Sequence, residues 1–297
     1  MWSTGRRFSR SNELSIVPNS WRATTQIALP LKQIHWLRVR LYRHSSVASN
    51  SRGGFHRVRI ARMSPDFTSI APNLTLIRER IASASKRAGR RADEITLVGV
   101  SKTFPADAIR AAYEIGLRDF GENRVQEWET KRPHLDDLRA TWHLIGHLQS
   151  NKARRAVRLF SRVDSVDSID LARKLDSSAA EEGKRLPISI EVHLGNEETK
   201  TGISETDLPS LAEAVAKLPQ LELLGLMTIP PFADDAELAR PYFRKLRELR
   251  DALSTRLGRP LPVLSMGMSH DFEVAIEEGA TEIRVGTALF GGRQAKA

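Results

Sequence analysis

The sequence predicts an α/β protein, a single (β/α)8 TIM-type barrel preceded by one extra helix. Eight short apolar runs recur along the chain, and stretches of helix-forming residues alternate with them. This alternation is typical of parallel strands joined by helices. A doubly wound open sheet is the structural alternative. It is disfavoured because no G-x-G-x-x-G follows the first run and no G-x-x-x-x-G-K-[ST] occurs anywhere.

The regular pattern begins with a helix that precedes the first strand. Leu74, Ile77, Ile81 and Ala84 have the spacing of one helical face, and Gly89 follows as a stop signal. The first strand is predicted over residues 95–100, whose short apolar sequence suits a strand covered on both faces. It leads directly into Ser101 and Lys102.

The other predicted elements alternate in the same way. We predict strands at 119–121, 142–146, 162–166, 188–192, 223–227, 263–266 and 282–285. Helices are predicted at 105–115, 149–159, 168–182, 207–217 and 236–257, with a further one around 271–278. Unusual polar residues and glycines follow several of the strands directly. In a barrel of this kind those strand ends meet at one mouth, where ligands bind.

The net charge of +10 is concentrated at one end of the chain. Residues 1–62 hold twelve basic side chains against the single acid Glu13, so the rest of the chain is close to neutral. We therefore expect no nucleic-acid partner for the body of the protein. A nucleic-acid binder that works through the basic segment alone is retained as an alternative.

Residues 1–62 form a separate segment in this interpretation, and residues 63–297 form the barrel. The segment is rich in Arg and Ser and has no apolar period, so we expect it to be disordered. It is a transit peptide, a basic arm, or sequence upstream of a true start at Met63. We expect a cytoplasmic location, or an organellar one if the segment is a transit peptide.

Two absences narrow the possible chemistry. The chain has no Cys, which excludes disulfides, thiolate metal ligands and Cys nucleophiles. No apolar run reaches the ~20 residues of a membrane span, so no membrane partner is expected.

Lys102 is the first candidate for chemistry. A lysine at the end of a barrel strand lies over the mouth, where partial desolvation favours its neutral, nucleophilic amine. Such an amine can form a Schiff base with a carbonyl compound. The simpler alternative is an ordinary charge on the rim.

Two later stretches predict a phosphate site opposite Lys102. Residues 265–269 run into a helix, and residues 284–288 place Gly286 and Thr287 where backbone amides could face an anion. Loops after strands seven and eight are the recurrent phosphate site of this architecture. The alternative is that Ser269 only caps its helix and the glycines only serve tight turns.

These stretches belong to a set of motifs that resembles a known family, the pyridoxal phosphate homeostasis proteins, also called the YggS or PROSC family. The fold of this family is similar to the N-terminal domain of alanine racemase. The resemblance covers about residues 70–293. Its motifs are Val100-Ser-Lys-Thr103, Gly121-Glu-Asn-Arg-Val-Gln-Glu127, His143-Leu-Ile-Gly-His-Leu-Gln-Ser-Asn-Lys152, Gly225-Leu-Met-Thr228, Leu264-Ser-Met-Gly-Met-Ser269 and Ile283-Arg-Val-Gly-Thr-Ala-Leu-Phe-Gly291.

The resemblance implies the cofactor pyridoxal 5′-phosphate, bound as a Schiff base on Lys102. It implies phosphate contacts from Ser269 and from the backbone of Gly286 and Thr287, with Ser265 serving either the phosphate or the loop. Further implied contacts are Arg284 at the pyridine nitrogen and Asn123 and Met227 around the ring.

The same resemblance implies a carrier or regulator of the cofactor with no assigned catalytic residue. An Arg cation at the pyridine nitrogen opposes its protonation and weakens the cofactor as an electron sink. The chain also ends soon after Arg293, without the second domain that supplies a racemase's opposing base. A slow racemase and a Schiff-base aldolase are the alternatives. Implied partners are apoenzymes that use the cofactor, with the chain a monomer or weak dimer.

Other conspicuous residues are assigned simpler roles, and no metal site is expected. On a strand, the Cα atoms of His143 and His147 would lie about 13 Å apart, too far for the two side chains to bind one metal ion. Ser269, His270 and Asp271 are adjacent and do not form a triad. Residues 152–155 are a solvated basic face or an anion or partner contact. The loop with Lys200 and Gly202 resembles a family loop without an assigned role.

Overall fold

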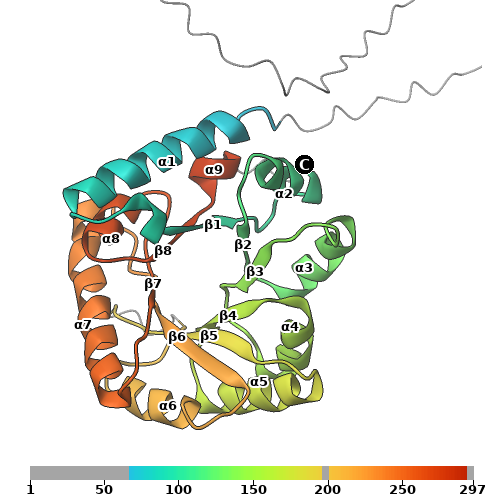
Figure 1. Ribbon diagram of the computed structural model, residues 1–297, viewed down its shortest axis with the longest axis vertical. Helices are drawn as coiled ribbons and strands as arrows, with labels where there is room; N and C mark the ends of the chain where they lie inside the picture. The colour runs from blue at the N-terminus through green and yellow to red at the C-terminus, as the bar shows by residue number, and fades with distance from the viewer. Residues whose placement is uncertain (1–66, 196–200, 293–297) are drawn as a thin grey trace, which may run out of the picture. The chain divides into compact units, whose positions relative to one another are not determined.

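Eight parallel strands form a closed barrel in the part of the chain that the structure describes, residues 67–195 and 201–292 of a computed structural model (Figure 1). Each strand pairs with the next in sequence, and β1 closes the ring by pairing with β8. The strands are β1 (Thr96–Val100), β2 (Asp119–Glu122), β3 (Thr141–Leu144), β4 (Arg162–Val166), β5 (Leu186–Glu191), β6 (Leu221–Met227), β7 (Val263–Ser265) and β8 (Glu282–Val285). The predicted fold class is confirmed.

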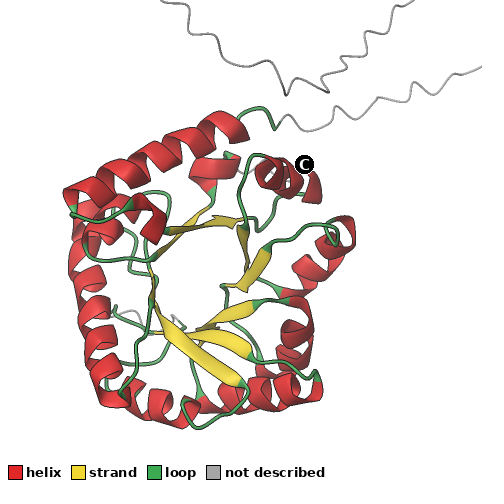
Figure 2. Ribbon diagram, in the orientation of Figure 1, coloured by secondary structure: helices red, strands yellow, loops and turns green. Residues whose placement is uncertain are grey.

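Helices surround this barrel as an outer ring (Figure 2). They are α1 (Ile70–Arg87), α2 (Ala106–Glu114), α3 (Val125–Lys131), α4 (Ala153–Leu159), α5 (Ile169–Glu181), α6 (Leu208–Val215), α7 (Arg240–Leu257), α8 (Phe272–Glu277) and α9 (Thr287–Phe290). Short 3-10 turns lie at Ala92–Glu94, Arg132–His134, Ser150–Lys152 and Ala236–Ala239. No helix within the described ranges has the length and apolar character that crossing a bilayer requires.

The leading helix α1 packs against α8 and α9. Its buried residues include Ile70, Leu74, Ile77 and Ile81, which share one face because they recur every three or four positions. Asn73 Nδ2 donates to the Leu289 carbonyl at 3.0 Å, and Arg80 forms an ion pair with Glu273 at 2.7 Å. The extra helix therefore covers the side of the barrel that α8 and α9 also cover (Figure 1).

The predicted strands and helices match these elements, with differences at their ends. β5 and β6 each begin two residues before the predicted runs, and β3 ends at Leu144 rather than 146. No helix was predicted at α3 or at α9. With four residues, α9 is too short to show an apolar period. The prediction about residues 1–62 lies outside the described residues.

Charged side chains fill part of the barrel interior. Arg162 and Asp164 lie two apart on β4, and His143 and Glu282 join them from β3 and β8. Arg162 contacts Asp164 at 2.5 Å and Glu282 at 3.1 Å. By type and proximity, His143, Asp164 and Glu282 could hold a metal ion. The guanidinium of Arg162 already supplies positive charge to both carboxylates, so the cluster is accounted for as an internal ion network.

His143 and His147 hydrogen-bond to different carboxylates. His143 lies between Asp164, 3.0 Å from Nδ1, and Asp119, 3.2 Å from Nε2. Burial opposes its charged form, but the hydrogen bonds to Asp119 and Asp164 outweigh that effect and raise the pKa of His143 to about 9. His147 contacts Asp167 instead, at 3.1 Å.

Candidate functional site

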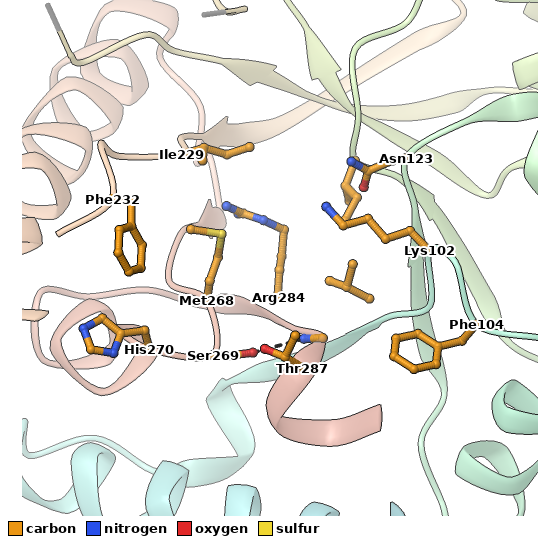
Figure 3. Close-up of a pocket in the computed structure, with 13 residues that line it drawn as sticks. Lys102, Phe104, Asn123, Ile229, Phe232, Met268, Ser269, His270, Arg284 and Thr287 are labelled. Carbon is orange, nitrogen blue, oxygen red and sulfur yellow. Dashed lines mark hydrogen bonds between the residues drawn. The ribbon is translucent and has the colours of Figure 1, made fainter. Parts of the chain in front are cut away.

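A cavity of about 270 Å³ opens at the ends of strands β1 and β8, where the predicted ligand site lies (Figure 3). This volume is near the lower end of the ~300–1,000 Å³ typical of small-molecule sites. Six of the eight predicted contact residues line it: Lys102, Asn123, Ser269, Arg284, Gly286 and Thr287. Segments almost two hundred residues apart thus meet around one small space.

Lys102 extends into this cavity from the end of β1. Figure 3 shows its amine pointing across the space toward the side where Arg284 lies, with Asn123 close beside it. Asn123 follows β2, the strand that pairs with β1 through Val100 and Gly121. The side chain of Lys102 therefore lines the cavity, and the role of its amine stays a prediction.

Ser269 connects the two loops of the predicted phosphate site. Its hydroxyl accepts hydrogen bonds from the backbone nitrogens of Gly286 and Ala288, each at 3.3 Å. The hypothesis that Ser269 caps the following helix is wrong. Asp271 is the N-cap residue of α8, and its carboxylate accepts from the backbone N–H of Met268 at 2.6 Å.

The turn before α8 depends on a glycine. Gly267 has φ +93°, and a Cβ there would lie 2.6 Å from the Cβ of Ala275. Such a contact is shorter than packed carbon atoms allow, so a larger residue would push α8 away from the end of β7. Gly267 therefore sets the position of Ser269 relative to Gly286.

Arg284 is a buried cation in the cavity wall. Its guanidinium donates through Nη1 to Ser265 Oγ and through Nη2 to the Thr228 carbonyl, both at 2.8 Å. Only 3% of the residue is exposed. Burial lowers the pKa of Arg284, partly offset by the carboxylates of Glu282 and Asp164. The folded protein thus holds a poorly solvated positive charge beside the ligand space.

Ser265 and Met227 are not among the residues that line the cavity. Both are fully buried, and they pair with each other across β6 and β7. Ser265 reaches the cavity only through the hydrogen bond that it accepts from Arg284. Direct ligand contacts from these two residues remain a prediction.

Several residues that line the cavity, most of them apolar, were not predicted from the sequence. Phe104 packs on Phe290 with ring centroids 5.0 Å apart, and Ile229 and Phe232 follow β6 with 40% and 78% exposure. The remaining missed lining residues are Val100, Ile145, Met268 and His270. The signal was present in residues 229–232, because large apolar residues in a proline-containing loop after a barrel strand have no core to join.

A second cavity lies beside the first and shares Asn123 with it. Its volume is about 410 Å³, and Arg124, His147 and Lys152 line it together with polar and apolar neighbours. An anion contact at Lys152 agrees with this position and stays a prediction. Lys200 lies outside the described residues. At Gly202, with φ +114°, a Cβ would lie 2.9 Å from the backbone nitrogen of His193, so this glycine has a packing reason.

The cavity's polar groups suit a small anion with a reactive carbonyl. An amine, a buried guanidinium, two hydroxyls and a glycine turn all face it, and no carboxylate lines it among the described residues. Apolar side chains cover the remaining wall, as they do in most small-molecule sites.

The chain is similar to a known protein family, to relatives from several bacteria and to solved structures. Residues 73–294 match the family described as alanine racemase, N-terminal domain. The chain is 48% identical over 221 residues to a pyridoxal phosphate homeostasis protein of Aquifex aeolicus. The aligned region covers 74% of this chain and 97% of that protein. For the Escherichia coli protein of that name, identity is 42% over 229 residues, covering 75% and 97%. The structure of PipY from Synechococcus elongatus, solved with PLP bound, has 42% identity, TM-score 0.66, and coverage of 72% and 100%.

Proposed function

Because the chain belongs to the pyridoxal phosphate homeostasis protein family, with the fold of the alanine racemase N-terminal domain, we propose that it binds pyridoxal 5′-phosphate and manages this cofactor in the cell. One observation carries the proposal. Lys102 and the turn of Ser269, Gly286 and Thr287 line the same cavity of about 270 Å³. Lys102 and this turn are far apart in the sequence, and the folded barrel brings them together.

Different lining residues would contact different parts of the cofactor. When bound, it supplies an aldehyde that Lys102 would capture as a Schiff base. Ser269 and the backbone of Gly286 and Thr287 would hold its phosphate, because all three residues line the same part of the cavity. The Gly286 N–H donates to Ser269 Oγ in this structure, so a phosphate contact from it would replace that hydrogen bond. Asn123 would contact the ring.

A role in storage and delivery follows from the cation in the wall. Arg284 beside the ring nitrogen would oppose protonation of that nitrogen, since like charges repel. This arrangement restrains carbanion chemistry and favours a carrier over an enzyme. Apoenzymes that use the cofactor are the proposed recipients.

The decisive experiment is the absorption spectrum of the purified protein with the cofactor added. We expect a near-visible band that Lys102→Ala removes, and borohydride should fix the cofactor on the peptide that contains Lys102. Lys217→Ala, at an exposed position on the outer ring, is the matched control and should keep the band. A band that survives in Lys102→Ala would refute the covalent assignment. Turnover of L- or D-alanine faster than ~1 s⁻¹ would instead favour a racemase.

A further inference from the structure

A buried lysine lies behind the end of β1 and connects the residues on both sides of Lys102. Lys131, the last residue of α3, is 8% exposed. Its Nζ donates to the Ser101 carbonyl at 2.9 Å and lies 2.8 Å from Glu122 Oε1 and 2.7 Å from Glu127 Oε1. Neither Lys131 nor Glu127 lines the cofactor cavity. We call Glu122, Glu127 and Lys131 the clamp.

Thr103, on the other side of Lys102, has a strained backbone. Its φ of +70° is the only positive value among the described non-glycine residues. This region is unfavourable for a β-branched side chain, so some other contact must maintain it. The backbone N–H of Thr103 donates to Glu127 Oε1 at 2.5 Å. Glu127 is held in turn by Lys131.

The residue before Lys102 is fixed by the same clamp. Ser101 Oγ donates to Glu122 Oε1 at 2.8 Å, and Glu122 is fully buried. The backbone thus leaves β1 through Ser101, carries Lys102, and turns at Thr103 with both flanking residues bonded to the clamp. Because the Cα to Cβ direction follows the backbone, the exit direction of the Lys102 side chain is set as well.

Charge keeps Glu127 able to accept the Thr103 hydrogen bond. Its burial favours the neutral acid, but the contacts with Lys131 and Thr103 outweigh this and lower the pKa of Glu127. A carboxylate accepts a stronger hydrogen bond than a neutral acid does.

From this geometry we infer that Lys131 and Glu127 are positioning residues, which aim the amine of Lys102 into the cavity by holding Thr103 in its left-handed conformation. The inference rests on the proposed covalent capture of the cofactor. It assigns a purpose to residues 121–127, a motif in which only Asn123 touches the cavity. A purely structural clamp would stabilise the barrel without affecting how fast Lys102 reacts.

The test compares Glu127→Ala with Glu129→Ala in the full chain. Glu129 lies on the same helix and pairs with Arg155, away from Lys102. Two quantities are measured: the rate at which added pyridoxal 5′-phosphate becomes borohydride-trappable, and the affinity for pyridoxine 5′-phosphate, which has no aldehyde. Glu127→Ala should slow trapping by about tenfold, since misplacing a reacting group costs rate steeply. The affinity for pyridoxine 5′-phosphate should stay unchanged in both variants.

Restoring the backbone conformation should restore the reaction. Glycine adopts positive φ without strain, so Thr103→Gly added to Glu127→Ala is expected to recover most of the trapping rate. Lys131→Met is the second variant and should behave like Glu127→Ala where it folds. Equal trapping in the Glu127 and Glu129 variants would overturn the inference, as would a slow variant that Thr103→Gly does not rescue. A wild-type protein with no Lys102-dependent band would instead refute the proposed function itself.

Discussion

The hydroxyl of Ser269 lies 3.3 Å from the backbone nitrogen of Gly286, so one serine joins the loop after β7 to the turn after β8. The two loops come from strands that pair with each other, and their relative position determines where an anion would be held. The serine therefore organises the predicted phosphate site even where it does not bind phosphate directly.

Replacing Ser269 by Ala should weaken phosphate recognition selectively. The variant leaves the N–H groups of Gly286 and Ala288 without their acceptor and removes a hydroxyl, and we expect a net loss of about 1–2 kcal/mol in binding free energy. Affinity for pyridoxal 5′-phosphate should fall about tenfold, while affinity for pyridoxal, which lacks the phosphate, should change little. Equilibrium titration of both compounds checks this.

The control for this variant is Ser177→Ala, which removes an exposed serine hydroxyl on α5. An equal loss of affinity for both compounds in Ser269→Ala would show that the serine supports the ring pocket rather than the phosphate.

The stability of the barrel should fall at alkaline pH because of His143. Its pKa is raised from 6.5 to about 9 in the folded protein. A group with a raised pKa stabilises the fold fully below its unfolded value and loses that contribution as the pH passes its folded value. The free energy of unfolding should therefore drop by about 3 kcal/mol between pH 6.5 and 9.5. Urea unfolding across this range measures the drop.

His143→Gln should remove most of this pH dependence and lower stability at pH 7. His147→Gln, whose imidazole is half exposed, should keep the wild-type slope. The groups facing His143 are Asp119, Asp164 and Glu282, with Arg162 beside the last two. A wild-type curve that is flat from pH 6.5 to 9.5 would contradict the assigned charge on His143.

The barrel and its mouth were predictable because their signals are local. A strand covered on both faces appears in the sequence as a continuous apolar run. The residues that follow such a run can therefore be located from the sequence alone. Lys102, Ser269 and Gly286 were found in this way. Their grouping depended only on the rule that the ends of parallel barrel strands converge.

The hydrogen-bond partners of residues that are distant in the sequence could not be predicted. Whether Ser269 caps α8 or accepts from Gly286 depends on the position of a turn seventeen residues later. No helix was predicted over Glu127 and Lys131 and neither was assigned a role, yet the fold places both against the backbone around Lys102. His143 and Asp164 lie on the neighbouring strands β3 and β4, and the register of this pair brings them together.

Gly225, in one of the motifs that resemble the family, should prove structural. A Cβ at this position would lie 1.8 Å from the Val263 carbonyl oxygen on the neighbouring strand. Gly225→Ala must therefore push β6 and β7 apart, and we expect a loss of about 1–3 kcal/mol in the free energy of unfolding. Gly292→Ala, which meets no atom within 4 Å, should cost far less. Denaturant unfolding of both variants decides, and equal stabilities would disprove the packing argument.

Phe232 should affect cofactor release without affecting folding. It is 78% exposed although it lines the cavity, so little of its apolar surface is buried until a ligand arrives. Phe232→Ser should therefore change the free energy of unfolding by less than about 0.5 kcal/mol and weaken binding several-fold, mostly through faster release. Leu76→Ser is the matched control, because Leu76 is 56% exposed on α1 and does not line the cavity. Release is measured by dilution into a trap for the free aldehyde. Identical release rates in the two variants would mean that Phe232 does not cover the bound cofactor.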